Sequence, residues 1–410
     1  MTLFVFFKHV VICIMYNSDS VLYYSVLFLT AMFSTWWIFK KVLKIAVLKN
    51  IVDNPDARKL QKTPVPILGG VAVFFGIVVS MTASGLFYET FALFPVLGVM
   101  CIMLYVGVMD DILSLSPRMR FIVEILVVLM LIFCNNYSLN DFHGLWGIEV
   151  IPAWIAIPLT VFACVGIINA INLIDGVNGL CSGYCITVCS IFAVVFIWAD
   201  YFAAASLAIL SVGALIPFFC HNVFGKKSKM FLGDGGTLMM GIAISAFVIR
   251  TLDSDSPLHR VVDDNFGLIA FTLAVLAVPV FDTLRVMSMR IIRGKSPFSP
   301  DKTHLHHLLF DMGFSHIGTT VTEILANLMV VGLWYLSYKA GASIDFQLYL
   351  VIALGLLITF GFYRFARIQQ QKNTRIFRML QKIGQWTHVG HTKGFEAFRD
   401  FLDRGCSGLS

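Results

Sequence analysis

Five aspartates are the side chains of this sequence best suited to chemistry. They fall in four separate stretches, each at or near the end of a long apolar run: Asp110, Asp111, Asp175, Asp234 and Asp282. An ionisable group at the centre of a membrane span costs about 2.5 to 3.5 kcal/mol even on a lenient insertion scale. One such acid could simply lie among lipid headgroups or cap a helix, but five together favour a common functional site.

Carboxylates gathered beside basic loops can hold a divalent cation and anionic groups together. Magnesium suits such a site best, with manganese as an alternative, because Mg²⁺ prefers oxygen ligands and is commonly held by one or two carboxylates plus substrate phosphates. Phosphoryl transfer then requires positioning, neutralisation of charge and activation of a nucleophile. The acids therefore favour a magnesium-dependent transfer of a phosphoryl group.

The adjacent acids Asp110 and Asp111 follow Gly107 at the end of an apolar run. Neighbouring side chains on a helix point about 100° apart, so both can face one site only at the rim of the helix or in an unwound end. One of the two could bind the metal while the other acts as base or nucleophile.

Two glycine-containing segments surround two of the other acids. Residues 169–180 place Asn172, Asp175 and Asn178 between two apolar runs, where a plain polar turn is the alternative interpretation. Residues 231–236 place Asp234 among three glycines at a predicted helix start. Backbone can approach a phosphate closely there, and the positive helix end favours an anion. A flexible helix start is the alternative for this second segment.

A basic loop at 288–320 carries Arg293 and three histidines within four residues, His304, His306 and His307. If Asp301 caps a helix, His304 and His307 share one face of it and His306 points elsewhere. Zinc is disfavoured here because no Cys lies close and the HExxH spacing is absent. Contact with a pyrophosphate or a sugar is the preferred interpretation, and solvent-exposed histidines are the alternative.

The elements that position these residues must be membrane spans. The chain is 58% hydrophobic and only 13% charged, against roughly 25% charged in soluble domains, which excludes soluble, disordered and fibrous classes. The net charge of +6 does not indicate nucleic acid, because basic residues that flank spans give the same excess. We therefore expect an all-α polytopic membrane protein with about eleven transmembrane helices, at 21–39, 67–87, 91–109, 121–134, 154–172, 180–198, 202–219, 231–250, 266–287, 321–338 and 346–363.

The basic residues predict the orientation of these spans. Twenty-six Lys and Arg fall on one set of loops and four on the other. The positive-inside rule makes the first set cytoplasmic, which places the N-terminus outside, the C-terminus inside and the acids on the cytoplasmic face. We expect residues 1–20 to be an N-terminal extension without a signal cleavage site, 21–363 the membrane domain, and 364–410 a basic cytoplasmic tail lying on the inner leaflet.

Taken in order, five motifs resemble the polyprenyl-phosphate N-acetylhexosamine-1-phosphate transferases, the membrane family of WecA-type and MraY-type enzymes. The motifs cover most of the chain: Arg58-Lys59 with 63–70, Asp110-Asp111, 172–179, Asn222 with 231–234, and 293–307. Many members have Asp at the position of Asn178 and His at that of Gln61. The resemblance implies a cytoplasmic site in the inner membrane that moves a sugar-1-phosphate from a UDP-sugar to polyprenyl (undecaprenyl) phosphate and releases UMP.

The resemblance also implies roles for individual residues. Asp234 is tied to magnesium, Asp110 to activation of the lipid phosphate and to the metal, with Asp111 beside it. The other implied positions lie around the nucleotide, the pyrophosphate or the sugar: Lys59, Asn172, Asp175, Asn178, Asn222, Arg293, His304, His306 and His307. Asp110, Asp111 and Asp175 are the expected catalytic acids.

The His-x-His-His pattern of 304–307 resembles the branch that uses simple N-acetylhexosamine donors, so UDP-GlcNAc or a close relative is expected. A muramyl-pentapeptide donor is the alternative within the family. An ion-coupled transporter is the rival from another class, disfavoured because the acids cluster on one face and no internal repeat appears. An inactive scaffold would be expected to lack one of the acids. A homodimer is left open, and no nucleic-acid partner is expected.

Overall fold

The computed structural model describes residues 18–55, 61, 63–84, 93–297, 302–390 and 392–406. Across these residues the chain is almost entirely helical, and the short antiparallel sheet of β1 and β2 pairs Val52 with Pro66 and Asp53 with Val65. The elements are α2 Ser18–Leu48, β1 Val52–Asp53, β2 Val65–Pro66, α3 Gly69–Ser84, α4 Phe94–Leu113, α5 Pro117–Asn135, η2 Leu145–Gly147, α6 Ala153–Leu173, α7 Leu180–Trp198, α8 Phe202–Phe224, α9 Gly233–Thr251, η3 Pro257–Arg260, α10 Leu268–Val275, α11 Ala277–Ile292, α12 Leu305–Asp311, α13 His316–Lys339, α14 Ile344–Leu356, the π-helical η4 Leu357–Phe362, α15 Tyr363–Gln371, α16 Arg375–Trp386 and α17 Lys393–Asp403.

The predicted class of fold, a polytopic all-α membrane protein, is confirmed. Each of the eleven expected stretches overlaps at least one helix of the described residues. Within the described residues, seven helices are long and apolar enough to cross a membrane, or eight if a bent pair counts as one span. The count of eleven is not confirmed, because α3, α5 and α9 do not meet that test of length and composition.

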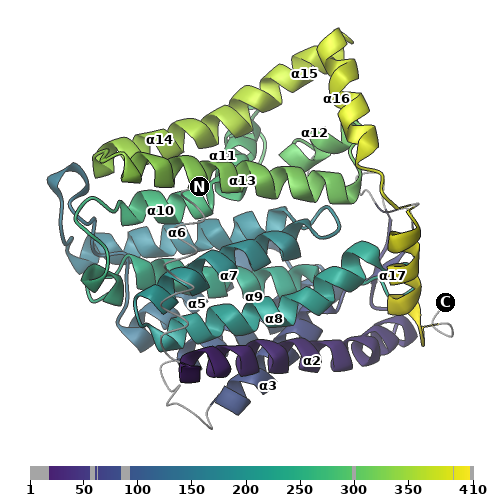
Figure 1. The fold of residues 1–410 in the computed structure, drawn as a ribbon, viewed down its shortest axis with the longest axis horizontal. Coiled ribbons are helices and arrows are strands. Elements are labelled where there is room, and N and C mark those ends of the chain that lie inside the picture. Colours follow the sequence, from purple (N-terminus) through teal and green to yellow (C-terminus); the bar gives the residue numbers. More distant parts are fainter. Residues whose placement is uncertain are drawn as a thin grey trace.

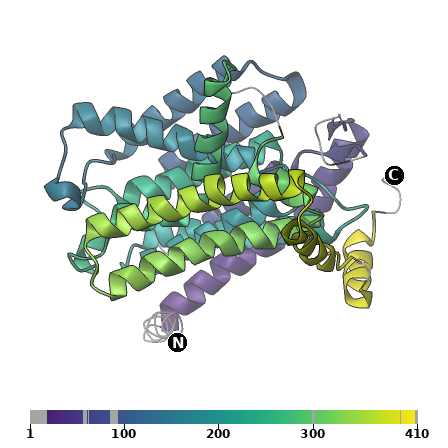
Figure 2. The ribbon, with the colours of Figure 1, turned by 90° about the horizontal axis from the view of Figure 1, so that it is seen from above.

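The expected straight span at 266–287 is instead two helices, α10 and α11, bent by 75°; Figure 2 shows α11 crossing the direction of the other helices. The cause is Pro279, which has no N–H and whose ring would clash with the carbonyl four residues earlier. That carbonyl, of Val275, accepts hydrogen bonds from Tyr184 Oη (2.7 Å) and Asn327 Nδ2 (2.9 Å). Asn327 Oδ1 accepts from Val278 N, so the break leaves these backbone groups paired.

Helix α9 lies at the centre of the bundle and packs against α3, α4, α6 and α7. Almost every residue of α9 is buried, which explains how a helix that carries Asp234 and Arg250 lies among membrane spans. Small residues allow the close packing: a Cβ on Gly107 of α4 would lie 2.4 Å from the backbone of Asp234, and one on Gly70 of α3 would lie 2.4 Å from that of Gly236. Large apolar side chains on α2 and α4 are exposed instead, as expected for surfaces that face lipid.

The loops form two separate ends of the bundle. The turn after α6, the start of α9 and helices α12, α16 and α17 lie at one end, on the right in Figure 1. The loop between α5 and α6, in blue, lies at the other end in both views. The four stretches that hold the five acids belong to the first end. Helices α4 and α6 end there and α9 begins there, while Asp282 of α11 contacts His304 of the segment that lies against the turn after α6.

The C-terminal tail folds back onto this end of the bundle. The helix of α14 continues through η4 into α15, so the last apolar stretch and the start of the tail form one run of helix. Asp403 of α17 accepts hydrogen bonds from the backbone N of Lys226 (3.2 Å) and Ser228 (2.9 Å). Helix α16 exposes an apolar stripe at Ile376, Met379, Ile383 and Trp386. Its expected position on the inner leaflet stays a prediction that this stripe supports.

The close approach of α4 and α9 makes Gly107 sensitive to any side chain. We expect Gly107→Ala to lower the free energy of unfolding by about 1–3 kcal/mol, because the added methyl forces the backbones of α4 and α9 apart. Gly98→Ala on the same helix is the matched control, since a Cβ there meets no atom within 4 Å. Thermal unfolding of both purified variants in detergent would measure the effect; equal melting temperatures would contradict the packing argument.

Candidate active site

The start of α9 is fixed to the segment that leads into α3 by backbone hydrogen bonds. Phe231 N donates to Pro66 O (2.7 Å), and Gly69 N and Gly70 N donate to Phe231 O and Leu232 O (3.0 and 2.8 Å). Gly233 has φ +73°, and a Cβ there would lie 2.6 Å from Asp111 Oδ2. Glycine is therefore needed at this position, both for the left-handed backbone and for the space beside Asp111.

Arg120 of α5 connects the acids of two other helices. Its Nη1 lies 3.3 Å from Asp110 Oδ2 and 3.6 Å from Asp234 Oδ2, and its Nε lies 3.5 Å from Glu124 Oε1. The buried Asn169 completes the group, since its Nδ2 donates to Glu124 Oε2 (2.5 Å) and its Oδ1 lies 3.5 Å from Arg120 Nη2. One guanidinium thus holds three carboxylates from α4, α5 and α9.

Asp234 and Asp110 are both oriented by further hydrogen bonds. Asn172 Nδ2 donates to Asp234 Oδ1 (2.9 Å) and lies 2.8 Å from Thr237 Oγ1. Asp110 Oδ1 accepts from Leu115 N (2.8 Å), just past the end of α4. Asn172 therefore lies beside Asp234 in the structure, and its contact with a nucleotide stays a prediction.

Within the described part of the chain, no Lys or Arg forms an ion pair with Asp111 or Asp175. Asp111 instead faces the backbone N–H groups of Asp234 and Gly235 at the start of α9, with Gly235 N 3.5 Å from Asp111 Oδ2. Asp175 lies in the turn after α6. Burial raises the pKa of Asp175 well above its ordinary value, and the nearby charges of Asp234, Asp111 and Asp53 raise it further. Among the described residues around Asp111 and Asp175, negative charge thus exceeds positive charge.

The donor set fits a hard divalent cation. Asp111, Asp175 and Asp234 offer only oxygen atoms, which Mg²⁺ prefers. Mg²⁺ keeps several waters and takes part of its coordination from substrate phosphates, so it does not need a closed cage of protein ligands.

The histidine segment is held by Asp282 of α11. His304 Nδ1 lies 2.8 Å from Asp282 Oδ2, and Arg285 Nη2 lies 2.6 Å from Asp282 Oδ1. Arg285 also donates to the carbonyl of Thr303 (2.6 Å). The other nitrogen of His304, Nε2, is buried and has no hydrogen-bond partner among the described residues. Asp282 therefore orients an imidazole whose second nitrogen is available to a ligand.

His306 joins the histidine segment to the turn that carries Asp175. A Cβ on Gly176 would lie 2.8 Å from His306 Nε2, so a side chain at position 176 would have to displace the ring. Burial lowers the pKa of His306 well below its ordinary value. The rings of His304 and His306 are stacked, with centroids 5.5 Å apart and an angle of 4° between their planes. The ring centroid of His307 lies 4.5 Å from that of His306.

The expected pairing of His304 with His307 on one helix face is wrong. Helix α12 begins at Leu305, so His304 is the residue before the helix and has extended backbone (φ −62°, ψ 156°). Its ring therefore turns toward Asp282 and stacks on His306. Asp301, the expected capping residue, lies outside the described residues.

Two predicted asparagines hold the backbone of this region. Asn222 Oδ1 accepts from Gly179 N (2.6 Å), and its Nδ2 donates to Met230 O (2.8 Å). The backbone of Asn178 is bound to α13, through His316 Nδ1 (3.2 Å) and Thr320 Oγ1 (3.1 Å). In the structure both asparagines fix the turn beside Asp175, and their contact with a substrate stays a prediction.

One other predicted residue, Arg293, is not brought into the group. Arg293 follows the end of α11 and is exposed, with no side-chain ion pair to the described acids. Lys59 lies outside the described residues. Gln61, which stands where many members of the resembled family have His, donates from Nε2 to Asp53 Oδ2 (2.5 Å).

The sequence did not identify Arg120, Glu124, Asn169 or Asp53 as parts of the site. The available signal was the pair Arg120 and Glu124, four residues apart at the start of a short apolar helix, which is the spacing of an ion pair on one helix face. Asp53 gave no signal, because only the fold brings it near Asp175.

Comparison with known proteins points to one family. A family model described as "Glycosyl transferase family 4" matches residues 93–252. A probable undecaprenyl-phosphate N-acetylglucosaminyl 1-phosphate transferase of Bacillus subtilis (strain 168) is 32% identical over 71% of this chain and 78% of its own length. Undecaprenyl-phosphate alpha-N-acetylglucosaminyl 1-phosphate transferases of Escherichia coli O157:H7 and Salmonella typhi are 28% and 27% identical, over 75% and 73% of this chain and 81% and 80% of theirs.

Removal of the Arg120 guanidinium should expose the repulsion among the acids. We expect Arg120→Met to lower the free energy of unfolding by about 1–3 kcal/mol in metal-free buffer, because Asp110, Glu124 and Asp234 lose their shared cation. Arg118→Met is the matched control, since Arg118 is exposed on the first turn of the same helix. Thermal unfolding with and without Mg²⁺ checks this: Mg²⁺ should restore part of the loss. Identical melting curves for the two variants would contradict the role given to Arg120.

Proposed function

The chain belongs to the glycosyl transferase family 4, and from this membership we propose that it transfers N-acetylglucosamine-1-phosphate from UDP-GlcNAc to undecaprenyl phosphate and releases UMP. The observation that carries the proposal is the group of acids at one end of a multi-pass bundle, where no Lys or Arg among the described residues forms an ion pair with Asp111 or Asp175. Such a site suits a nucleotide pyrophosphate and a lipid phosphate together with a divalent cation. The product would begin a lipid-linked surface glycan.

Magnesium is the proposed cation, held by Asp234 with Asp111 and Asp175. When bound, it would neutralise negative charge on the pyrophosphate and on the departing UMP. The occupation of Asp110 by Arg120 and Leu115 N favours Asp111 over Asp110 as the partner of Asp234 at the metal. Coordination by Asp110 nevertheless stays a prediction of the family resemblance.

Arg120 and the acids of α4 are proposed to have separate roles in the reaction. Arg120 holds Asp110 and Asp234 at fixed positions, so little reorganisation is needed when the anionic substrates bind. Asp110, at the end of α4, is proposed to orient and activate the lipid phosphate, with Asp111 beside it. The lipid phosphate oxygen attacks the β-phosphorus of UDP-GlcNAc, the bond from that phosphorus to the bridging oxygen breaks, and the electron pair leaves with UMP.

The histidine segment is proposed to bind the pyrophosphate or the sugar. His304 presents a buried Nε2 without a hydrogen-bond partner among the described residues, and Asp282 fixes the ring through Nδ1. His306, placed against Gly176, connects this segment to the acid turn. Arg293 and Lys59 would add positive charge for the two anionic substrates.

The inner membrane is the proposed location, with the acids and the C-terminus on the cytoplasmic side. The distribution of Lys and Arg supports this orientation, which would let the acids meet a UDP-sugar from the cytoplasm. A transporter is disfavoured by the structure, because the acids gather at one end of the helices, whereas transporter sites lie near the bilayer midplane.

The nucleotide product and the donor are the first test. With undecaprenyl phosphate and Mg²⁺, the purified chain should convert UDP-GlcNAc or a close epimer to UMP and a lipid pyrophosphate, and should not turn over the muramyl-pentapeptide nucleotide. Chromatography of the released nucleotide distinguishes the outcomes. Release of UDP would indicate an ordinary glycosyltransferase, and exclusive use of the muramyl donor would overturn the choice of branch.

The second test addresses the metal. Asp234→Asn keeps the size of the side chain but removes one anionic charge, so turnover should fall by on the order of 10² and the Mg²⁺ concentration for half-maximal activity should rise. Asp264→Asn, at an exposed acid of the opposite end, is the control and should behave as wild type. A variant at position 234 with normal turnover and an unchanged Mg²⁺ requirement would refute the assignment.

A further inference from the structure

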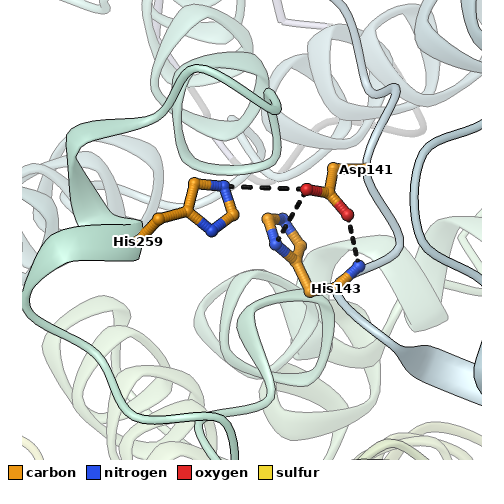
Figure 3. A group of neighbouring side chains, drawn as sticks. All are labelled: Asp141, His143 and His259. Carbon is orange, nitrogen blue, oxygen red and sulfur yellow. Dashed lines mark hydrogen bonds and ion pairs between the residues drawn. The ribbon is translucent and has the colours of Figure 1, made fainter.

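A second group of ligating side chains lies at the opposite end of the bundle. Asp141 and His143 belong to the loop between α5 and α6, and His259 belongs to η3. Their ligand atoms all lie within 4.8 Å of one another, and Figure 3 shows both imidazole rings directed at the Asp141 carboxylate. Helix α9 leads from Asp234 toward this end, and its 19 residues correspond to about 28 Å. The group is therefore separate from the acid site.

The His143 ring lacks the hydrogen bonds that a buried imidazole normally makes. Its side chain is only 8% exposed. Nδ1 lies 3.6 Å from Asp141 Oδ2, beyond hydrogen-bond distance, and Nε2 has no partner among the described residues. A metal ion between His143 Nδ1 and Asp141 Oδ2 would give both of these atoms a ligand bond.

The spacing of the three groups fits a tetrahedral metal ion. Zinc–ligand bonds of 2.0–2.2 Å place neighbouring ligand atoms about 3.3 Å apart. Asp141 Oδ2 lies 3.6 Å from His143 Nδ1 and 3.8 Å from His259 Nε2, so these two pairs are within a few tenths of an ångström of that spacing, and the two imidazole nitrogens lie within 4.8 Å of each other. Two imidazole nitrogens and one carboxylate oxygen are typical zinc ligands. Water, or the carbonyl oxygen of Asp253 at 3.3 Å from His259 Nε2, would complete the coordination.

The two loops that supply the ligands are already joined. Asn140 Nδ2 donates to Ser254 Oγ (3.1 Å), Asn140 Oδ1 accepts from Ser254 N (2.9 Å), and Asp253 Oδ2 accepts from Ser138 N (3.1 Å). Asp141 Oδ1 accepts from His143 N (2.7 Å), which fixes the carboxylate and leaves Oδ2 directed at the rings. His143 also has φ +53°, a conformation rare for residues other than glycine, so the fold holds this ring in place at a cost.

We propose that Asp141, His143 and His259 bind a zinc ion that links the loop between α5 and α6 to the loop after α9. The ion would lie on the face of the membrane opposite the acid site and would stabilise the junction of these loops. The proposal concerns metal binding alone and is independent of the transferase activity.

Zinc binding to the purified full-length chain tests the proposal. The protein in detergent is stripped with EDTA, dialysed and titrated with Zn²⁺ against a chromophoric chelator, with excess Mg²⁺ present to saturate the carboxylates of the other end. We expect one zinc ion per chain and a higher melting temperature with Zn²⁺. His259→Ala and Asp141→Asn should each weaken binding at least about tenfold and abolish the thermal shift.

The variants separate a lost ligand from a damaged fold. The His259 side chain is one-third exposed (33%), so His259→Ala should melt at the wild-type temperature without zinc and keep wild-type transferase activity. Asp141→Asn retains an oxygen for the hydrogen bond from His143 N. His388→Ala in the exposed tail is the control and should bind zinc as wild type. No zinc bound by wild type in the presence of Mg²⁺, or equal affinity in His259→Ala and His388→Ala, would overturn the proposal.

Discussion

The structure depends on keeping several negative charges at one end of an apolar bundle. Asp110, Glu124 and Asp234 share the single guanidinium of Arg120, while Asp111 and Asp175 have no cation within the described residues. Such an arrangement repels itself unless positive charge is added. Under the proposed function, a divalent cation together with anionic substrates would supply that charge, so the excess of negative charge would favour binding of a metal–phosphate complex.

The helix packing is what brings the acids together. Gly107 and Gly70 allow α4 and α3 to touch the backbone of α9, which places Asp111 beside the start of α9. Asn172 at the end of α6 reaches Asp234, and Asn222 at the end of α8 fixes the turn that carries Asp175. The ends of four helices thus meet in one small region, and the surrounding apolar spans strengthen the electrostatic interactions there.

The sequence was sufficient for features that depend on local composition. The run at 180–198 coincides with α7, because span length and apolarity are properties of one stretch of chain. The acids could be placed at one face from loop charges alone. The pairing of Arg120 with Asp234, the approach of Asp53 to Asp175 and the group of Asp141 with His259 could not be predicted, since each joins segments far apart in the chain. The break before Pro279 and the start of α12 after His304 also depend on tertiary partners.

The location of the metal tests the central claim most directly. Crystals of the purified chain grown with Mn²⁺ and UDP-GlcNAc would give an anomalous difference map in which manganese marks the site occupied by magnesium. We predict a peak in contact with Asp234 and with Asp111 or Asp175, next to the pyrophosphate of the donor. Manganese bound elsewhere, with the donor pyrophosphate away from these carboxylates, would contradict the account.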